Sequence, residues 1–294
     1  MVKAATTRDY HARMQRVLKY IDEHIDADLH VEILSGVAAF SKYHFHRQFT
    51  ELFGIGVHRY VQLVRLKRAS YRLAFRADEP ILQIALDSRY EGPEAFSRAF
   101  KQLAGQTPTA FRKQPRWSPW HVTFGSINEA RKISMTTALT DDQVRIVDFP
   151  ATSVAILAHH GDPAHLGDTI RRFIAWRKQA GLPPTISATF NILHADPETT
   201  PPPEYRLDLC AATGRVPPND AGVVAGLIPA GRCAVLRLTG SSDTLRSAIA
   251  FLYADWLPRS GEQLRDFPIY VQRVSFFPDV AEHAAMTDVF LPLR

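Results

Sequence analysis

The sequence predicts a multidomain chain, in which an all-α tandem helix-turn-helix domain is followed by an α+β domain of duplicated β-α-β-β units. Three observations support this prediction. With 294 residues the chain is long for one domain, a motif recurs after 51 residues in the first third, and a strand-and-helix pattern recurs after 79–80 residues in the second half. The expected boundaries are 8–114 for the helical domain, 115–142 for a linker and 143–294 for the α+β domain.

Composition is that of an ordinary globular protein, with 46% hydrophobic residues. There is no apolar run of 18 residues, and the first ten residues lack the pattern of a secretory signal, so we expect a cytoplasmic protein without a membrane partner. Cys210 and Cys233 lack metal-ligand spacing and are expected as reduced core residues on strands.

Charge is distributed unevenly along the chain. Residues 1–116 hold 19 of the 35 basic and 12 of the 30 acidic residues, a balance of +7, and the remainder has a balance of −2. A basic first third joined to a near-neutral partner suggests that only the first part meets a polyanion.

The motif in the first third is a ten-residue stretch that occurs twice. Phe45-His46-Arg47-Gln48-Phe49-Thr50-Glu51-Leu52-Phe53-Gly54 returns as Phe96-Ser97-Arg98-Ala99-Phe100-Lys101-Gln102-Leu103-Ala104-Gly105, with Phe, Arg, Phe, Leu and Gly repeated. Such internal similarity indicates two copies of one structural unit.

Each copy has the pattern of a short helix, a turn and a second helix. The short helices are expected at about 31–38 and 81–87. The second helices bury residues at i, i+4 and i+7, namely Phe45, Phe49 and Leu52 in one copy and Phe96, Phe100 and Leu103 in the other. Gly54 and Gly105 are placed to end these helices, and Thr107-Pro108 to begin another.

A long amphipathic helix is expected between the copies, at about 57–76, with its charge supplied by Arg65, Lys67, Arg68, Arg72 and Arg76. Twenty helical residues span about 30 Å, and successive major grooves on one side of B-DNA lie about 34 Å apart. The spacing therefore suits two helices in adjacent grooves. The alternative is a helical repeat without a DNA role.

Taken together, these residues resemble the AraC/XylS-type DNA-binding domain over about residues 10–113. The resemblance is carried by Ser41-Lys42-Tyr43-His44-Phe45-His46-Arg47-Gln48-Phe49, Arg65-Leu66-Lys67-Arg68-Ala69, Ile84-Ala85, Phe96-Ser97-Arg98-Ala99-Phe100-Lys101 and Gly105-Gln106-Thr107-Pro108-Thr109-Ala110-Phe111-Arg112. The chain departs from the family at Ala39 and Arg89, where glycine is common in the turn, and at Gly56, where a capping Ser or Thr is usual.

The resemblance implies that outward residues of each second helix read bases. By position these are Tyr43, His46 and Arg47 in the first copy and Glu94, Ser97 and Arg98 in the second. Arginine matches the O6 and N7 acceptors of guanine. Because Pro93 and Glu94 make a poor reading surface, the second helix is expected to contribute mainly backbone contacts.

The second duplication lies within 143–294. A strand at 154–157 leads to Gly161 and a helix ending near Trp176, and a strand at 234–236 leads to Gly240 and a helix ending near Trp256. Each unit then continues into two strands. Two such copies predict a pseudo-twofold domain, whose seam is a natural place for a ligand.

This half resembles the GyrI-like effector-binding domain. The matching segments are Phe149-Pro150-Ala151, Gly161, Asp196-Pro197, Tyr205-Arg206-Leu207-Asp208-Leu209-Cys210, Ile228-Pro229-Ala230-Gly231, Tyr253-Ala254-Asp255-Trp256-Leu257-Pro258-Arg259-Ser260-Gly261 and Thr287-Asp288-Val289-Phe290-Leu291-Pro292-Leu293. Relatives of this kind bind hydrophobic, often cationic, small molecules, and a few hydrolyse reactive compounds. The acidic residue that members often carry before Ile-Tyr is Pro268 here, which argues against both a cationic ligand and hydrolysis.

Candidate pocket residues are aromatic: Phe190, Tyr205, Tyr253, Trp256 and Tyr270, with plain core packing as the alternative for each. No catalytic residue, cofactor or metal site is predicted, and His159-His160-Gly161-Asp162 with His165 is interpreted as a surface turn.

The sequence thus predicts a regulator that binds double-stranded DNA sequence-specifically and responds to a small hydrophobic effector. RNA polymerase is a candidate partner, and two reading units in one chain favour a monomer on DNA. A DNA-tethered GyrI-like hydrolase and a module that sequesters toxic small molecules remain the alternatives, and activation and repression both stay open.

Overall fold

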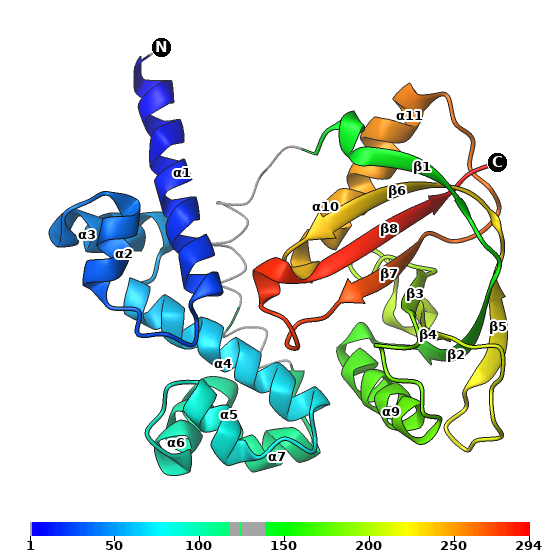
Figure 1. Ribbon diagram of the computed structural model, residues 1–294, viewed down its shortest axis with the longest axis horizontal. Coiled ribbons are helices and arrows are strands. Elements are labelled where there is room, and N and C mark those ends of the chain that lie inside the picture. The colour runs from blue at the N-terminus through cyan, green and yellow to red at the C-terminus, as the bar shows by residue number, and fades with distance from the viewer. Residues whose placement is uncertain (1, 118–123, 125–138) are drawn as a thin grey trace. The chain divides into compact units, whose positions relative to one another are not determined.

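The computed structural model describes residues 2–117, 124 and 139–294, and the chain divides into two compact units. The first consists of Met1–Thr137 with Ala281–His283, and the second of Ala138–Val280 with Ala284–Arg294. The first unit is helical and the second is built on one eight-stranded sheet (Figure 1). The predicted linker, residues 115–142, falls mostly outside the described residues. No described helix is both long and apolar enough to cross a membrane.

The described helices of the first unit follow the predicted order after α1, for which no helix was predicted. They are α1 (Val2–Glu23), α2 (Val31–Ala38), α3 (Lys42–Phe53), α4 (Val57–Phe75), α5 (Ile81–Asp87), α6 (Pro93–Ala104) and α7 (Pro108–Lys113). The short helices predicted at 31–38 and 81–87 are confirmed, and the linking helix ends one residue earlier than expected, at Phe75.

The ends of these helices are determined by local chemistry. The Ser41 hydroxyl accepts a hydrogen bond from the His44 N–H at 3.4 Å, and the Thr107 hydroxyl accepts one from Ala110 at 3.2 Å, which satisfies exposed donors of α3 and α7. Gly54 ends α3 at φ 70° and Gly105 ends α6 at φ 69°, in the left-handed conformation that glycine adopts at little cost.

The core of the first unit is rich in phenylalanine. Phe45, Phe49 and Phe53 of α3 are all buried, whereas Leu52, which was predicted to complete the stripe, is only half-buried. Phe53 takes that place because an i, i+4, i+8 series also stays on one helical face. Trp117, near the start of the predicted linker, stacks on Phe75 with ring centres 5.9 Å apart and packs against this core.

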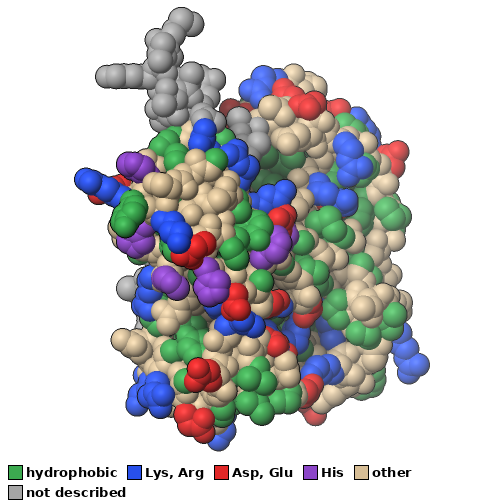
Figure 2. Space-filling view, turned by 60° about the vertical axis from the view of Figure 1, so that its left-hand side comes forward, with side chains coloured by type: hydrophobic (Ala, Val, Ile, Leu, Met, Phe, Trp, Pro, Cys, Tyr) green, Lys and Arg blue, Asp and Glu red, His purple; other side chains and the backbone are tan. Residues whose placement is uncertain are grey.

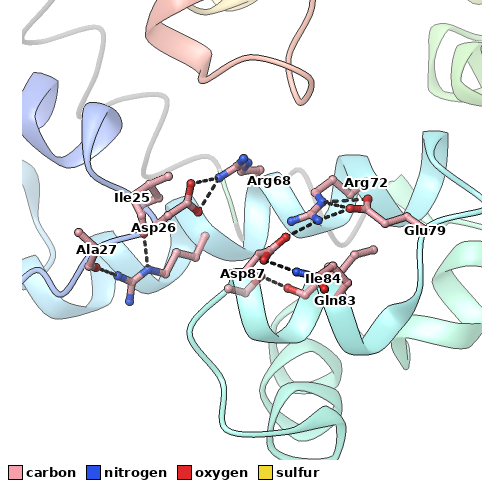
Figure 3. Close-up of polar contacts among 11 residues, drawn as sticks. Ile25, Asp26, Ala27, Arg68, Arg72, Glu79, Gln83, Ile84 and Asp87 are labelled. Atoms are coloured by element: carbon pink, nitrogen blue, oxygen red, sulfur yellow. Dashed lines mark hydrogen bonds and ion pairs between the residues drawn. The ribbon is translucent and has the colours of Figure 1, made fainter.

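Arginines of α4 attach this helix to the connection between α1 and α2. The Arg65 side chain donates to the carbonyl of Ile25 at 3.0 Å and to that of Ala27 at 2.7 Å. Arg68 donates to both carboxylate oxygens of Asp26, at 2.7 and 3.0 Å (Figure 3). These contacts fix the start of the first helix-turn-helix unit on α4.

Arg72, one turn further along α4, attaches the helix to the second helix-turn-helix unit. Its Nε lies 2.9 and 3.0 Å from the carboxylate oxygens of Glu79, and its Nη2 lies 2.6 Å from Asp87 at the end of α5 (Figure 3). Burial alone would lower the pKa of Arg72, but the hydrogen bonds with the two carboxylates outweigh it and raise the pKa. This arginine is therefore an internal tie rather than part of a solvated basic face.

The second unit contains strands β1 (Val144–Phe149), β2 (Thr152–His160), β3 (Thr189–Leu193), β4 (Arg206–Ala212), β5 (Val224–Ile228), β6 (Gly231–Thr239), β7 (Tyr270–Ser275) and β8 (Met286–Pro292). They form one antiparallel sheet in the order β1-β6-β8-β7-β3-β4-β2-β5. This order reads as two copies related about the β3–β7 pair, which confirms the predicted duplication.

Each copy has one more strand than the β-α-β-β pattern, placed before it. β1 begins the first copy and pairs with β6 of the second, and β5 begins the second copy and pairs with β2 of the first. The matching pairs Pro150-Ala151 and Pro229-Ala230, which follow these strands, were the signal for them in the sequence. The copies are thus interlocked through exchanged edge strands.

The helices of the second unit cover one face of the sheet. α9 (Leu166–Gln179) packs on Ala155, Leu157, Leu209 and Ala211, and the segment from α10 (Leu245–Ala250) to α11 (Leu257–Ser260) packs on Ala234, Leu236, Val271 and Val289. Because successive strand residues point to opposite faces, the residues between these positions lie on the other face.

A π-helical turn, Phe251–Trp256, joins α10 to α11 and explains a shift in the repeat. Leu166 corresponds to Leu245 at an offset of 79, whereas Trp176 corresponds to Trp256 at 80. A π turn accommodates one extra residue, and Pro258 beyond it lacks the N–H needed for a regular α-helical bond. Both tryptophans consequently remain buried.

The opposite face of the sheet is strongly curled inward (Figure 1). Phe149 at the end of β1 has its ring 6.0 Å from that of Phe190 on β3, although three strands separate β1 from β3 in the sheet. In a flat sheet four strand spacings would place them about 19 Å apart. The sheet therefore folds over this face, with Phe149, Phe190, Tyr270 and Phe290 inside it; we call these four residues the aromatic face.

We expect replacement of Arg72 by methionine to destabilise the first unit by about 2 kcal/mol, because Glu79 and Asp87 would be left as partly buried carboxylates without this cation. Differential scanning calorimetry of the full chain measures the change. Replacement of the exposed Arg98 by alanine is the control and should stay within about 0.5 kcal/mol of wild type. Equal effects of the two substitutions would contradict an internal role for Arg72.

Candidate nucleic-acid interface and effector face

The two helix-turn-helix turns share one backbone geometry. Ala39 after α2 has φ 54° and Arg89 after α5 has φ 65°, so both occupy the left-handed region at the positions where the resemblance leads one to expect glycine. Phe40 N donates to Ser35 O at 3.0 Å, and Tyr90 N donates to Ala85 O at 3.1 Å. Side chains at these positions cost about 1 kcal/mol each relative to glycine, and the turn is preserved in both copies.

α3 presents the first predicted reading surface. Its buried phenylalanines hold one side of the helix against the core, and the three predicted residues Tyr43, His46 and Arg47 are all exposed on the other side. Tyr43 is 91% exposed, whereas a tyrosine that contributes to the core would be mostly buried. The imidazole of His46 lies over Gly56, since a Cβ there would be 3.8 Å from its Nε2.

α6 presents the second surface, and it differs from the first. Phe96 and Phe100 are buried, Arg98 and Glu94 are exposed, and Ser97 is half-buried. The Glu94 carboxylate folds back toward Gly92, where a Cβ would lie 3.5 Å from its Oε2. A carboxylate in the first helical turn interacts favourably with the positive end of the helix dipole, and Glu94 stands at that position in α6.

Arg47 and Arg98 occupy equivalent positions of the two copies, each on the side of its helix opposite the buried phenylalanines. In Figure 2 the first unit shows histidine side chains gathered with lysine and arginine on one face. Exposed histidines of this unit include His30, His44, His46 and His58. The surface offers donors and positive charge, as a nucleic-acid interface requires.

Of the predicted pocket residues, Phe190 and Tyr270 come together on the aromatic face, with ring centres 6.4 Å apart. Phe149 contacts both of them edge to face, and Tyr270 stacks on Phe290 at 4.9 Å. Burial, and then the contact with the Cys233 sulfur at 3.4 Å, raise the pKa of the Tyr270 hydroxyl. This phenol is accordingly a neutral group.

The other three predicted pocket residues lie elsewhere. Trp256 and Tyr253 both belong to the π turn, where Trp256 is buried against the opposite face of the sheet and Tyr253 is 40% exposed. Tyr205 packs edge to face against His159, 5.9 Å between ring centres. None of these three residues lies on a strand, since Tyr253 and Trp256 belong to the helical segment that covers the opposite face and Tyr205 directly precedes β4. Aromatic content alone did not distinguish these positions from those on the aromatic face.

Two buried carboxylates flank the aromatic face and were not among the predicted residues. In the sheet register Asp208 stands in one row with Ile192, Tyr270 and Phe290, and Asp288 stands in the next row with Gln272 and Phe190. Residues opposite one another in antiparallel strands point to the same face. The signal for them was the repeat itself, which aligns Asp208 with Asp288.

Both carboxylates are paired with arginine. Asp208 accepts from Arg206 at 2.8 and 3.0 Å and from His194 at 2.9 Å, and Asp288 accepts two bonds of 2.7 Å from Arg237. Burial acts to raise the pKa of Asp208, but its hydrogen bonds outweigh burial and hold the pKa below the ordinary value. Pro268 lies just before β7 and provides no acid at the position where the family resemblance implies one.

In the second unit His159 and the two cysteines are buried, whereas His160 and His165 of the same histidine cluster are exposed. His159, predicted in a surface turn, is instead buried on β2, where its Nδ1 lies 2.8 Å from the Thr169 hydroxyl and its Nε2 lies 3.2 Å from the Asp162 carbonyl. Cys210 and Cys233 are buried free cysteines on strands, as predicted. Burial raises the pKa of both thiols.

Comparison with known proteins identifies both halves. Residues 142–294, just over half of the chain, match the GyrI-like small molecule binding domain, and residues 34–114 match a helix-turn-helix domain. The probable transcriptional regulator YgiV of Escherichia coli is 39% identical over 159 residues, which are 53% of this chain and 99% of YgiV. The right origin-binding protein of E. coli is 33% identical over 106 residues, 36% of each chain.

Among solved structures, a cryo-EM structure of an EcmrR–DNA complex is 14% identical and covers 88% of this chain and 84% of its own, with a TM-score of 0.43. The family match over residues 142–294 shows that the chain belongs to the GyrI-like family, and the chain carries a helix-turn-helix domain of the AraC type ahead of its GyrI-like small molecule binding domain.

Proposed function

We propose that this protein is a sequence-specific DNA-binding transcriptional regulator whose GyrI-like domain binds a small hydrophobic effector. The observation that supports it best is the pair of equivalent exposed arginines, Arg47 and Arg98, on two helices that one continuous helix, α4, connects. The 19 residues of α4 span about 28 Å. That length suits two helices in adjacent major grooves on one side of a duplex.

The two reading helices have unequal roles in this proposal. Tyr43, His46 and Arg47 supply a tyrosine, an imidazole and a guanidinium to the first groove. In the second helix the Glu94 side chain turns back on its own helix, so Arg98 is the main candidate for base contact there, with Ser97 beside it. One chain carries both helices, and a monomer can therefore occupy both grooves.

The effector site is proposed on the aromatic face. Its rings offer dispersion contacts to an apolar ligand, and they pack against one another within the face. Asp208 and Asp288 are bonded to arginines and Pro268 replaces the family's acid, so we propose that a neutral ligand is preferred to a cation.

The alternative of a GyrI-like hydrolase has less support. Hydrolysis needs a group that activates water, and each buried carboxylate beside the aromatic face already accepts hydrogen bonds from arginine. The names of the relatives, a probable transcriptional regulator and an origin-binding protein, favour a DNA-binding role over an enzyme. RNA polymerase remains a proposed partner. The proposal covers both activation and repression of transcription.

Replacement of Arg47 by alanine should weaken binding to a duplex selected from random sequences by roughly 10- to 100-fold, because a bidentate contact to guanine is lost. Binding to mixed-sequence DNA should fall only severalfold. Fluorescence anisotropy at fixed salt measures both affinities, and Arg98→Ala should show a smaller loss on the selected duplex. If Arg47→Ala weakened binding to both duplexes equally, base reading by this residue would be excluded.

Replacement of Phe149 by leucine should open space on the aromatic face and tighten the binding of a neutral apolar dye such as Nile red by severalfold. Phe173→Leu is the matched control, because Phe173 is also buried but belongs to α9, where it packs against the opposite face of the sheet. Fluorescence titration gives the dissociation constants, and near-ultraviolet circular dichroism checks that both variants stay folded. The same change in both variants, or preferential binding of the cationic dye rhodamine 6G, would contradict the proposed neutral site.

A further inference from the structure

A basic pocket lies within the first unit, between its two helix-turn-helix units. It has a volume of ≈ 480 Å³ and is lined by residues of three segments, the α1–α2 connection at 28–30, the first half of α4, and the turn before α6 at 88–90. We call it the central pocket. His30, His58, Arg59 and Arg89 on its lining are exposed, so the pocket opens to solvent.

Charge in the central pocket is unbalanced. Its lining has three arginines, Arg59, Arg65 and Arg89, against one carboxylate, Asp28, an excess of two positive charges before His30 and His58 are counted. Asp28 is already ion-paired with Arg89. Burial, and next the charge of Arg89, lower the pKa of Arg65. Such a site favours an anion.

The position of the central pocket relates it to both reading helices. His58 on its lining is two residues from Gly56, over which the His46 imidazole of α3 lies. Tyr90, on the other side of the pocket, packs against Phe96 of α6 with ring centres 5.5 Å apart. Its hydroxyl oxygen accepts a hydrogen bond from the side-chain amide of Gln62 on α4, the linking helix. The pocket thus lies between the surfaces that would enter two adjacent grooves.

Two successive major grooves on one side of a duplex are separated by a minor groove, which a phosphate backbone borders on each side. From the geometry we infer that the central pocket receives backbone phosphates beside this minor groove, with Arg59 and Arg89 as the chief cationic contacts. The inference rests on the proposed DNA-binding function and adds a contact that neither reading helix supplies. Phosphate contacts of this kind position a protein on DNA without reading sequence.

The conformation of Arg89 agrees with this role. Arg89 stands at φ 65°, where glycine is the least strained residue, and its counterpart Ala39 in the first copy has the same backbone conformation without a charged side chain. The first copy has no equivalent cation at this position, so the second turn carries a guanidinium that the shared backbone does not require. Arg89→Ala reproduces the residue already present in the first copy.

The test uses the full chain with Arg59→Ala, Arg89→Ala and the double substitution, and Lys19→Ala as a control that removes one exposed charge outside the pocket. Each pocket substitution should reduce the slope of log K against log salt by about 0.9. Each should also weaken binding to selected and mixed-sequence duplexes by a similar factor, roughly tenfold. Lys19→Ala should change the slope by much less.

Duplexes with neutral methylphosphonates then locate the contact. Substitution at the central phosphates, between the two recognised grooves, should weaken wild-type binding but leave the double variant nearly unaffected. Equal losses for both proteins, or no loss for wild type, would overturn the inference. So would an increase in the melting temperature of the protein with inorganic phosphate, if neutral central phosphates in the duplex left DNA binding unchanged. Failure of the proposed function is distinct, because no preferred sequence would then emerge from the random duplexes, whereas the salt slopes could still be compared on mixed-sequence DNA.

Discussion

The attachment of α4 to both of its neighbours through arginine is the constraint on which the first unit depends. Arg65 and Arg68 hold the connection that leads into α2, and Arg72 holds α5 through Asp87. Because all three arginines belong to one continuous helix, the distance between α3 and α6 is set by helical geometry rather than by a flexible linker. Such preorganisation removes part of the ordering cost of binding two grooves at once.

The same arginines change the meaning of the basic charge in this region. The excess of +7 over residues 1–116 includes Arg68 and Arg72, which are ion-paired inside the unit, and Arg65, whose guanidinium is committed to two carbonyls. Composition records how many cations are present but not how many face outward. In the proposed function, exposed arginines that remain to face DNA include Arg47 on α3, Arg98 on α6 and Arg59 in the central pocket.

The parts of the fold that could be predicted from the sequence are those with local causes. The bounds of α2 and α5 follow from periodicity, and Gly54 and Gly105 mark helix ends because their backbone conformation is local. Strands β1 and β5 were not predicted. Each pairs with a strand of the other copy of the repeat, and the sequence pattern within one copy gives no information on that pairing.

The reading residues could be predicted from local sequence, whereas the effector residues could not. Exposure of Tyr43 and Arg47 follows from the buried stripe on their own helix, so one helix was sufficient to predict it. Which aromatic residues share a face depends on strand parity and on the curl of the whole sheet, and only Phe190 and Tyr270 of five candidates met there. The central pocket is lined by three segments that lie between residues 28 and 90, and no spacing pattern in the sequence predicts it.

The curl of the sheet also bears on how an effector could act in the proposed function. A ligand shifts an equilibrium only if it binds one state more tightly than another. On the aromatic face the space is occupied by Phe149, whose ring contacts Phe190, Tyr270 and Phe290, so a ligand that takes this space must break those contacts. Phe149 is the last residue of β1, the edge strand that pairs with the other copy of the repeat. Displacement of the Phe149 side chain would therefore strain the pairing of β1 with β6. Filled and displaced states of one side chain thus provide the two states that regulation requires, and Phe149→Leu changes their balance without altering either paired carboxylate.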